Sequence, residues 1–446
     1  MAHWRQFQAN ASNQGFIPSS TGPATSFKWK TEVGPVSFGS PVIGNDGTVY
    51  IGNLFAELVA VAPDGTIRWK RALDQRGSSI PGSPAVDANG NIYAVTTYQA
   101  KVRDHRSGET VYSRVAQSKL HSLNPDGTLR WTFLFPPSGI PNMTNGYTLS
   151  SPKVSGRQNP HIFVPCIFTR IASRIEILVI DQAGNLVHRT QVADYPPPPL
   201  TSGGDIFDIF GSIWDFLNGV EFEPSGAPSL NQQFGIPEPT LAVADFGDFV
   251  AEPVVIIDDN YKKIAAFRWN NQRLLPLWEK NSSQARTNAT PAVLLSSQVA
   301  SGHHDGTLAL FDLMTGRELW KPWYKAPNAV QSPPASFVSQ IYLLSLIHLS
   351  ALDSNAKLIK RDTLGIMALG APAISADRVF VNGGDGYYTF SLDLKDVTKN
   401  GDFLGGVSSP AIADDGTVYV MDRNKMLWAF GNQMTKRPPR RTPIFK

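Results

Sequence analysis

The sequence predicts an all-β protein: a single eight-bladed β-propeller of four-stranded antiparallel blades. Three observations predict it. A small-Pro-Ala/Val opening recurs along the chain, Asp-Gly or Asn-Gly turns precede β-rich runs, and several repeats end in an equivalent tryptophan. The 446 residues include 37 glycines and 34 prolines, which is typical of turn-rich chains with short strands. Length alone allows two or three average domains, so the repeat decides the architecture.

The recurring opening defines the repeats. It reads GSPVI, GSPAV, SSPKV, PEPTL, ATPAV, SPPAS, GAPAI and SSPAI, and its anchor prolines are Pro41, Pro84, Pro152, Pro239, Pro291, Pro334, Pro372 and Pro410. The short intervals are about 38 to 43 residues, which is the spacing of one four-stranded blade, and the longer intervals imply insertions. Eight anchors therefore predict eight blades.

Two hairpins follow each anchor in the clearest repeats. The first is illustrated by NDGTVYIG (45–52) and DDGTVYVM (414–421), where Asp-Gly favours a tight turn and the Val/Tyr alternation favours a strand. The second is illustrated by ELVAVAPDGTIRWK, which reads as strand, turn and strand ending in Trp. These are the inner and outer hairpins of a blade.

Tryptophan recurs near the end of the second hairpin. A large ring at this place can wedge between neighbouring blades and bury roughly 150 to 250 Å². One equivalent aromatic per repeat is what a nearest-neighbour repeat architecture needs, so we interpret these residues as structural blade-docking groups and not as a cofactor site. They are Trp29, Trp69, Trp131, Trp278 and Trp320.

The two ends of the chain predict how the ring closes. The last repeat has no turn and Trp strand of its own, whereas SFKWKTEV (26–33) matches that missing strand and precedes the first anchor. We expect this N-terminal strand to complete the C-terminal blade and to remove the open sheet edges. The predicted organisation is an N-terminal extension (1–25), the propeller (26–431) and a basic Pro-rich tail (432–446).

The repeat resembles a known family. The DGT-hydrophobic-Tyr hairpin, followed by a turn and a Trp strand, resembles the pyrroloquinoline-quinone-like repeat of quinoprotein dehydrogenases and BamB-like outer-membrane assembly factors. The resemblance covers roughly 26–431. It implies a propeller that acts either in assembly or as an oxidoreductase dependent on pyrroloquinoline quinone and Ca²⁺. It also suggests a periplasmic or extracellular location, although the chain as given shows no signal peptide and leaves the location open.

The chemistry-bearing residues favour a non-catalytic protein with no cofactor. Members of the dehydrogenase branch resemble one another in a vicinal disulfide, which the single cysteine, Cys166, cannot form. His303, His304 and Asp305 form the densest group of metal-ligating residues, but they precede a Gly-Thr turn and favour a surface turn over a metal site. We predict no catalytic, cofactor-binding or metal residues. A quinoprotein oxidoreductase and a carbohydrate- or ligand-sensing propeller remain the alternatives.

An insertion between the third and fourth anchors is the strongest functional lead. YPPPP (195–199) precedes GGDIFDIFGSIWDFLNGVEFEPSG, whose apolar residues recur at helical spacing, so an amphipathic helix is predicted within about 193–237. It either covers the propeller's own rim or docks a protein partner. The predicted partner-binding residues are Phe207, Phe210, Trp214 and Leu217. A second, charged insertion spans 97–120.

Charge limits the classes of partner. The net charge is +3 and the last twelve residues carry five basic side chains, which leaves −2 on the rest of the chain. The body therefore lacks the basic surface of a nucleic-acid-binding protein. No segment has the length and apolarity of a transmembrane helix. The expected function is a protein-protein interaction or assembly scaffold.

Overall fold

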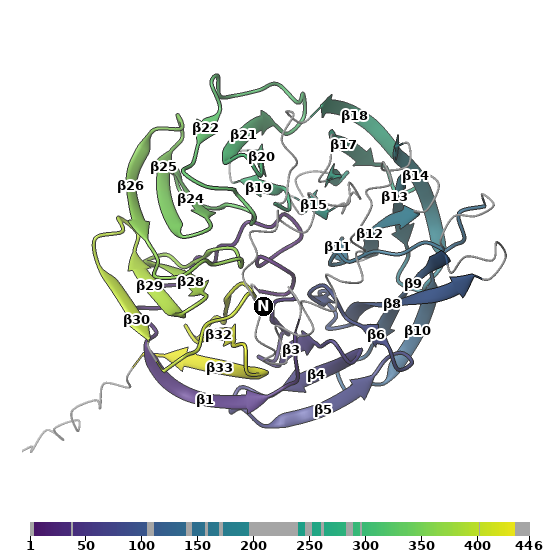
Figure 1. Ribbon diagram of the computed structural model, residues 1–446, viewed down its shortest axis with the longest axis horizontal. Coiled ribbons are helices and arrows are strands. Elements are labelled where there is room, and N and C mark those ends of the chain that lie inside the picture. Colours follow the sequence, from purple (N-terminus) through teal and green to yellow (C-terminus); the bar gives the residue numbers. More distant parts are fainter. Residues whose placement is uncertain are drawn as a thin grey trace, which may run out of the picture.

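The structure is a computed structural model. It describes residues 4–36, 39–104, 111–139, 145–156, 159–168, 173–195, 240–245, 252–259, 263–281, 289–294, 297–400 and 402–432. Within these ranges the chain forms strands and turns and no helix. The strands make eight sheets arranged as a closed ring (Figure 1), so the predicted eight-bladed propeller is confirmed.

The first four blades run from inner to outer strand as follows. Blade 1 contains β2 (Val42–Ile43), β3 (Val49–Gly52), β4 (Glu57–Val61) and β5 (Ile67–Ala72). Blade 2 contains β6 (Ser78–Ser79), β7 (Ala85–Val86), β8 (Ile92–Asp104), β9 (Val111–Leu123) and β10 (Leu129–Leu134). Blade 3 contains β11 (Lys153–Ser155), β12 (His161–Phe168), β13 (Ser173–Ile180) and β14 (Leu186–Tyr195). Blade 4 contains β15 (Thr240–Ala244), β16 (Val254–Asp258), β17 (Lys263–Trp269) and β18 (Leu274–Asn281).

The other four blades repeat this order. Blade 5 contains β19 (Ala292–Leu294), β20 (Gln298–Gly302), β21 (Thr307–Asp312) and β22 (Tyr324–Lys325). Blade 6 contains β23 (Ala335–Phe337), β24 (Gln340–Ser345), β25 (His348–Asp353) and β26 (Leu358–Thr363). Blade 7 contains β27 (Ala373–Ile374), β28 (Arg378–Gly383), β29 (Gly386–Ser391) and β30 (Val397–Asn400). Blade 8 contains β31 (Ala411–Ile412), β32 (Val418–Met421), β33 (Met426–Gly431) and, outermost, β1 (Ser26–Glu32).

Blade 8 joins the two ends of the chain. β1 pairs antiparallel with β33 from Ser26 opposite Gly431 to Glu32 opposite Met426, with one register shift. The outer strand of the last blade is thus supplied by the start of the ring, as the sequence predicted. This pairing closes the ring without an open blade edge.

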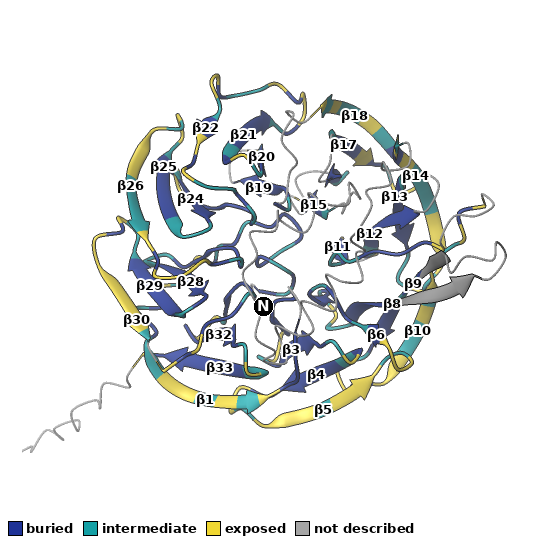
Figure 2. Ribbon diagram, viewed as in Figure 1, coloured by how far each residue is buried: buried dark blue, intermediate teal, exposed yellow. Residues whose placement is uncertain are grey.

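The hydrophobic core lies between the faces of neighbouring blades. The second and third strands of each blade are mostly buried, whereas the outer strands such as β5 are mostly exposed (Figure 2). One cluster, for example, combines Val42, Tyr50 and Leu58 of blade 1 with Val86 and Ile92 of blade 2. Each blade is therefore stabilised mainly by its two neighbours.

The alternating direction of the strands gives the ring two faces that carry different connections. The turns between first and second strands and between third and fourth strands lie on one face, which we call the turn face. The loops between second and third strands and the connections between blades lie on the other, which we call the loop face. The long β8–β9 hairpin and the connection between β14 and β15 both leave from the loop face, on blades 2 to 4.

Candidate functional site

Residues 4–17 lie inside the ring, where Figure 1 marks the N-terminus at the centre. Their main chain passes the inner strands in blade order. Backbone N–H groups of blades 1, 2, 4, 5, 6 and 7 donate to carbonyls of this segment over 2.7 to 3.4 Å: Ile43 to Trp4, Val86 to Arg5, Val243 to Ala11, Val293 to Ser12, Ser336 to Gln14 and Ile374 to Gly15. The sequence alone predicts no role for this segment beyond an N-terminal extension.

Blade 3 is held by a side chain instead of a carbonyl. The Gln6 amide donates to the Val154 carbonyl over 2.8 Å and accepts from the Val154 N–H over 2.9 Å. The innermost strand of a blade has one edge without a strand partner, so its N–H groups need another acceptor. In six of the seven blades, all but blade 4, the donor lies two residues after the anchor proline. Residues 4–17 therefore accept a hydrogen bond from an equivalent backbone N–H group in successive blades.

Asn13 is the centre of this arrangement. It is fully buried, and its Nδ2 donates to the Leu241 carbonyl of blade 4 over 3.0 Å and to the Pro291 carbonyl before blade 5 over 2.8 Å. Its Oδ1 accepts a hydrogen bond from Lys153 Nζ of blade 3. These three hydrogen bonds use both N–H donors and the oxygen acceptor of the Asn13 side-chain amide.

Lys153 is buried in the axis, where the acceptors that face its amine are neutral oxygens. It is 1% exposed, its Nζ lies 3.4 Å from the Phe7 carbonyl and 5.2 Å from the centre of the Phe7 ring. Burial lowers the pKa of its amine to about 7, because the charged form loses its hydration. The side chain binds the axial segment and the inner strand together.

The recurrent tryptophans lie between blades. Their indole N–H groups each donate over 2.8 to 2.9 Å to a carbonyl of the next blade: Trp29 to Pro63, Trp69 to Pro125, Trp131 to Gln182, Trp278 to Leu313 and Trp320 to Ser354. The rings of the first four also cover a turn glycine of that blade, at Gly65, Gly127, Gly184 and Gly316. This geometry uses the rings for packing between blades.

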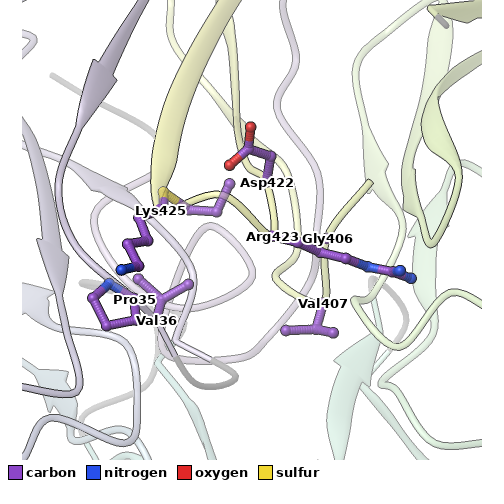
Figure 3. Close-up of a pocket in the computed structure, with 8 residues that line it drawn as sticks. Pro35, Val36, Gly406, Val407, Asp422, Arg423 and Lys425 are labelled. Carbon is purple, nitrogen blue, oxygen red and sulfur yellow. The ribbon is translucent and has the colours of Figure 1, made fainter. Parts of the chain in front are cut away.

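A small cavity opens on the loop face where blade 8 meets blade 1 (Figure 3). Pro35, Val36, Val407, Arg423 and Lys425 contribute to its lining. It holds about one water molecule and is far smaller than a drug-sized ligand site. Its carboxylate, Asp422, accepts from the Trp428 indole N–H over 2.7 Å and from two backbone N–H groups, so it stabilises the fold.

The residues of the axis do not fit a quinone and Ca²⁺ site. Such a site needs several oxygen ligands around the cation, and the described part of the chain contains no group of three His, Cys, Asp or Glu able to hold a metal. Carbonyls and amides of residues 4–17 occupy the turn-face end of the channel. Cys166 is buried within β12, and burial raises the pKa of its thiol.

The turn at His303 is less exposed than the sequence predicts, and two aspartates of blade 4 are buried as well. His303 is 1% exposed and stacks on Trp323 with ring centres 5.2 Å apart, although Asp305 does lie in a turn, where it accepts from the Thr307 N–H. Asp258 and Asp259 are fully buried; they accept from the Ser301 hydroxyl and the Tyr195 hydroxyl respectively. The ring over His303 belongs to the same blade, whereas the partners of Asp258 and Asp259 belong to neighbouring blades. Local sequence does not reveal these contacts.

The predicted partner-binding residues Phe207, Phe210, Trp214 and Leu217 lie outside the described residues, as does the rest of the predicted helix. The strands on either side are described. β14 ends at Tyr195 and β15 begins at Thr240. The Tyr195–Asp259 hydrogen bond joins the end of β14 to blade 4. The connecting segment thus starts from an anchored position on the loop face.

Comparison with known proteins agrees with this geometry. Residues 23–134 match the family described as outer membrane protein assembly factor BamB. No curated protein sequence matches the chain significantly. In the ranges that the structure describes, no helix could span a lipid bilayer.

Several solved propellers share the fold. BamB from Moraxella catarrhalis superposes with a TM-score of 0.56 at 13% identity, covering 92% of this chain and 100% of that chain. Quinohemoprotein alcohol dehydrogenase ADHIIG from Pseudomonas putida HK5 gives 0.63 at 12% identity, covering 99% and 82%. Saccharomyces cerevisiae Sqt1 gives 0.57 at 12% identity, covering 93% and 98%.

The fold and its tryptophan-docked blades define a closed eight-bladed β-propeller with its own chain in the axis. The match over 23–134 confirms the predicted resemblance to the BamB-like repeat for that part of the chain, and the solved neighbours share the propeller fold. The fold is shared by an assembly factor and by dehydrogenases, so it does not separate the two activities.

Proposed function

We propose that this protein is an assembly scaffold that binds a protein partner on its loop face. The observation that carries the proposal is that both insertions join the ring at that face: the β8–β9 hairpin has strands of 13 residues, and the long connection between blades 3 and 4 follows Tyr195 and ends at Thr240. Loops displayed on a rigid scaffold are the usual carriers of recognition.

The axis supports binding over catalysis. Its turn-face end contains the chain's own carbonyls and amides, and the described residues bring no cluster of nucleophile, base and acid together there. An enzyme of this fold needs a concave site with convergent polar groups. The interaction surface is therefore proposed on the rim loops, with Phe207, Phe210, Trp214 and Leu217 as its apolar anchors.

The test is a comparison of native complexes. We expect the double substitution Phe210→Ser and Trp214→Ser to remove partners that co-purify stoichiometrically with the tagged full chain, because buried aromatic anchors contribute most of an interface's binding energy. Val338→Ser is the matched control: Val338 is 70% exposed and lies in the turn between β23 and β24, on the turn face. Quantitative mass spectrometry measures recovery. Equal recovery with both variants would contradict the proposal.

A further inference from the structure

We propose that the turn-face end of the axial channel is a peptide-binding site specific for asparagine, and that residues 4–17 are its resident ligand. The site is distinct from the proposed partner surface, because its contacts lie beside the turns between first and second strands. Thr21 N–H, which follows the segment, bonds Asp377 in such a turn of blade 7.

The inner strands recognise the main chain of the ligand. Carbonyls at positions 11, 12 and 15 each accept a backbone N–H, from Val243, Val293 and Ile374, over 2.7 to 2.8 Å. Addition of an extended segment to unpaired strand edges is a recurrent mode of peptide recognition, in which backbone bonds give affinity and side-chain pockets give specificity. Here the edges of several blades converge on one segment.

The asparagine pocket supplies the specificity. Three neighbouring parts of the ring contact the Asn13 amide: Lys153 faces its oxygen, and the Leu241 and Pro291 carbonyls face its nitrogen. A carboxylate at this place would oppose two carbonyl oxygens, and an alanine would leave all three buried groups without this partner. The φ of Asn13 is +58°, a conformation that asparagine tolerates better than most residues.

The segment is separable from the ring that binds it. Each blade already has its four strands without residues 4–17, and β1 is paired with β33 independently. Pro18 and Ser20 are exposed and link the segment to the closing strand. The same site therefore accepts this peptide when it is supplied as a separate molecule.

The experiment exchanges the resident segment. The full chain is prepared with a specific protease site in place of residues 18–20 and cleaved, and a fluorescent synthetic peptide of residues 1–17 is added in excess. We expect saturable incorporation, measured by anisotropy, with the ring still folded by circular dichroism. Competing peptides with Asn13→Ala or Asn13→Asp should bind at least about 30-fold more weakly, since each leaves buried polar groups unpaired.

The matched control is a competing peptide with Gln14→Ala, which keeps the Gln14 carbonyl and removes a side chain that bonds only Asn10 of the same segment. Its affinity should stay within roughly 3-fold of the unchanged peptide, because no hydrogen bond to the ring is removed. Failure of the labelled peptide to enter a folded ring, equal competition by all the peptides, or unfolding of the ring when the segment leaves would each overturn the proposal. None of these results depends on the loop-face partner.

Discussion

At the residue scale, four of the eight blade junctions pair a tryptophan ring with a glycine, which has no side chain. A Cβ on Gly127 would lie 2.8 Å from Cδ2 of Trp69, and one on Gly184 would lie 2.7 Å from Cδ2 of Trp131. Both glycines also have positive φ, which strains any other residue. The indole N–H then reaches a carbonyl of the same turn. The turn glycine therefore determines both the backbone conformation of the turn and the packing of the indole ring.

We predict that Gly127→Ala lowers the free energy of unfolding more than Gly90→Ala does. The two glycines have φ of +83° and +87°, so both substitutions carry a similar backbone cost of about 1 to 2 kcal/mol. Only Gly127→Ala forces a methyl group into an indole ring. A Cβ on Gly90 would instead lie 3.3 Å from Cγ of Pro125. The additional cost should be about 1 to 3 kcal/mol. Urea unfolding measures it, and equal losses would argue against ring packing as the cause.

Lys153 gives the fold a pH dependence of definite sign. Burial lowers the pKa of its amine from 10.5 to about 7 in the folded protein, so between these values the unfolded chain binds more protons. Stability from this group therefore rises with pH above about 7 and is lost as pH falls toward 7. We predict that the wild-type protein gains up to about 2.7 kcal/mol relative to Lys153→Met between pH 7 and pH 9.

Urea unfolding of both proteins at pH 7, 8 and 9 measures this difference. The methionine variant keeps a side chain of similar size and removes the titrating amine, so it serves as the baseline for all other groups. Parallel pH profiles would show that the Lys153 amine remains charged when it is buried. The sequence contained one signal for this residue: SSPKV has Lys where GSPVI and GSPAV have apolar residues.

At the scale of elements, the strand that completes blade 8 was predictable because it has the same pattern as the outer strands of other repeats. β1 contains Trp29, and this ring reaches Pro63 of blade 1 as Trp69 reaches Pro125 of blade 2. The axial segment has no such pattern. Its contacts use backbone carbonyls. They join Asn13 to residues that are 228 and 278 positions away in the sequence, so no local periodicity could predict them.

Diverged junctions also show what local sequence could not reveal. His188 stands where four of the outer strands carry Trp, and Trp269 of blade 4 supplies a ring instead, with its centre 6.1 Å from that of His188 and 5.2 Å from that of His161. Trp269 is 1% exposed. A tryptophan therefore still packs between blades 3 and 4, but blade 4 supplies it instead of blade 3.

We predict that deletion of residues 1–33 abolishes cooperative unfolding, because it removes the outer strand of blade 8 and exposes the edge of β33. Deletion of residues 433–446, which begins after the last paired residue Gly431, serves as the control and should leave the transition intact. Circular dichroism during thermal unfolding measures both. A single sharp transition in the shorter chain would contradict closure by β1.

At the scale of the whole molecule, blade number and closure followed from the repeat because a propeller is a sequence of nearest-neighbour contacts. Function does not follow from that regularity. The same ring carries an assembly factor in one solved structure and an alcohol dehydrogenase in another. The features of this chain that bear on its function are therefore the segment in its axis and the face at which its two insertions join the ring, and the first of these can be tested directly with a cofactor.

We predict that pyrroloquinoline quinone with Ca²⁺ does not raise the melting temperature of this protein. A ligand at 100 times its dissociation constant stabilises a folded protein by about 2.7 kcal/mol, which thermal unfolding detects. Here the axial segment already bonds the inner strands of seven blades, and the described residues offer no cluster of metal ligands. A quinoprotein dehydrogenase stripped of its cofactor is the positive control. A saturable rise for this protein that matches the control would instead favour the oxidoreductase alternative, with the cofactor bound away from residues 4–17.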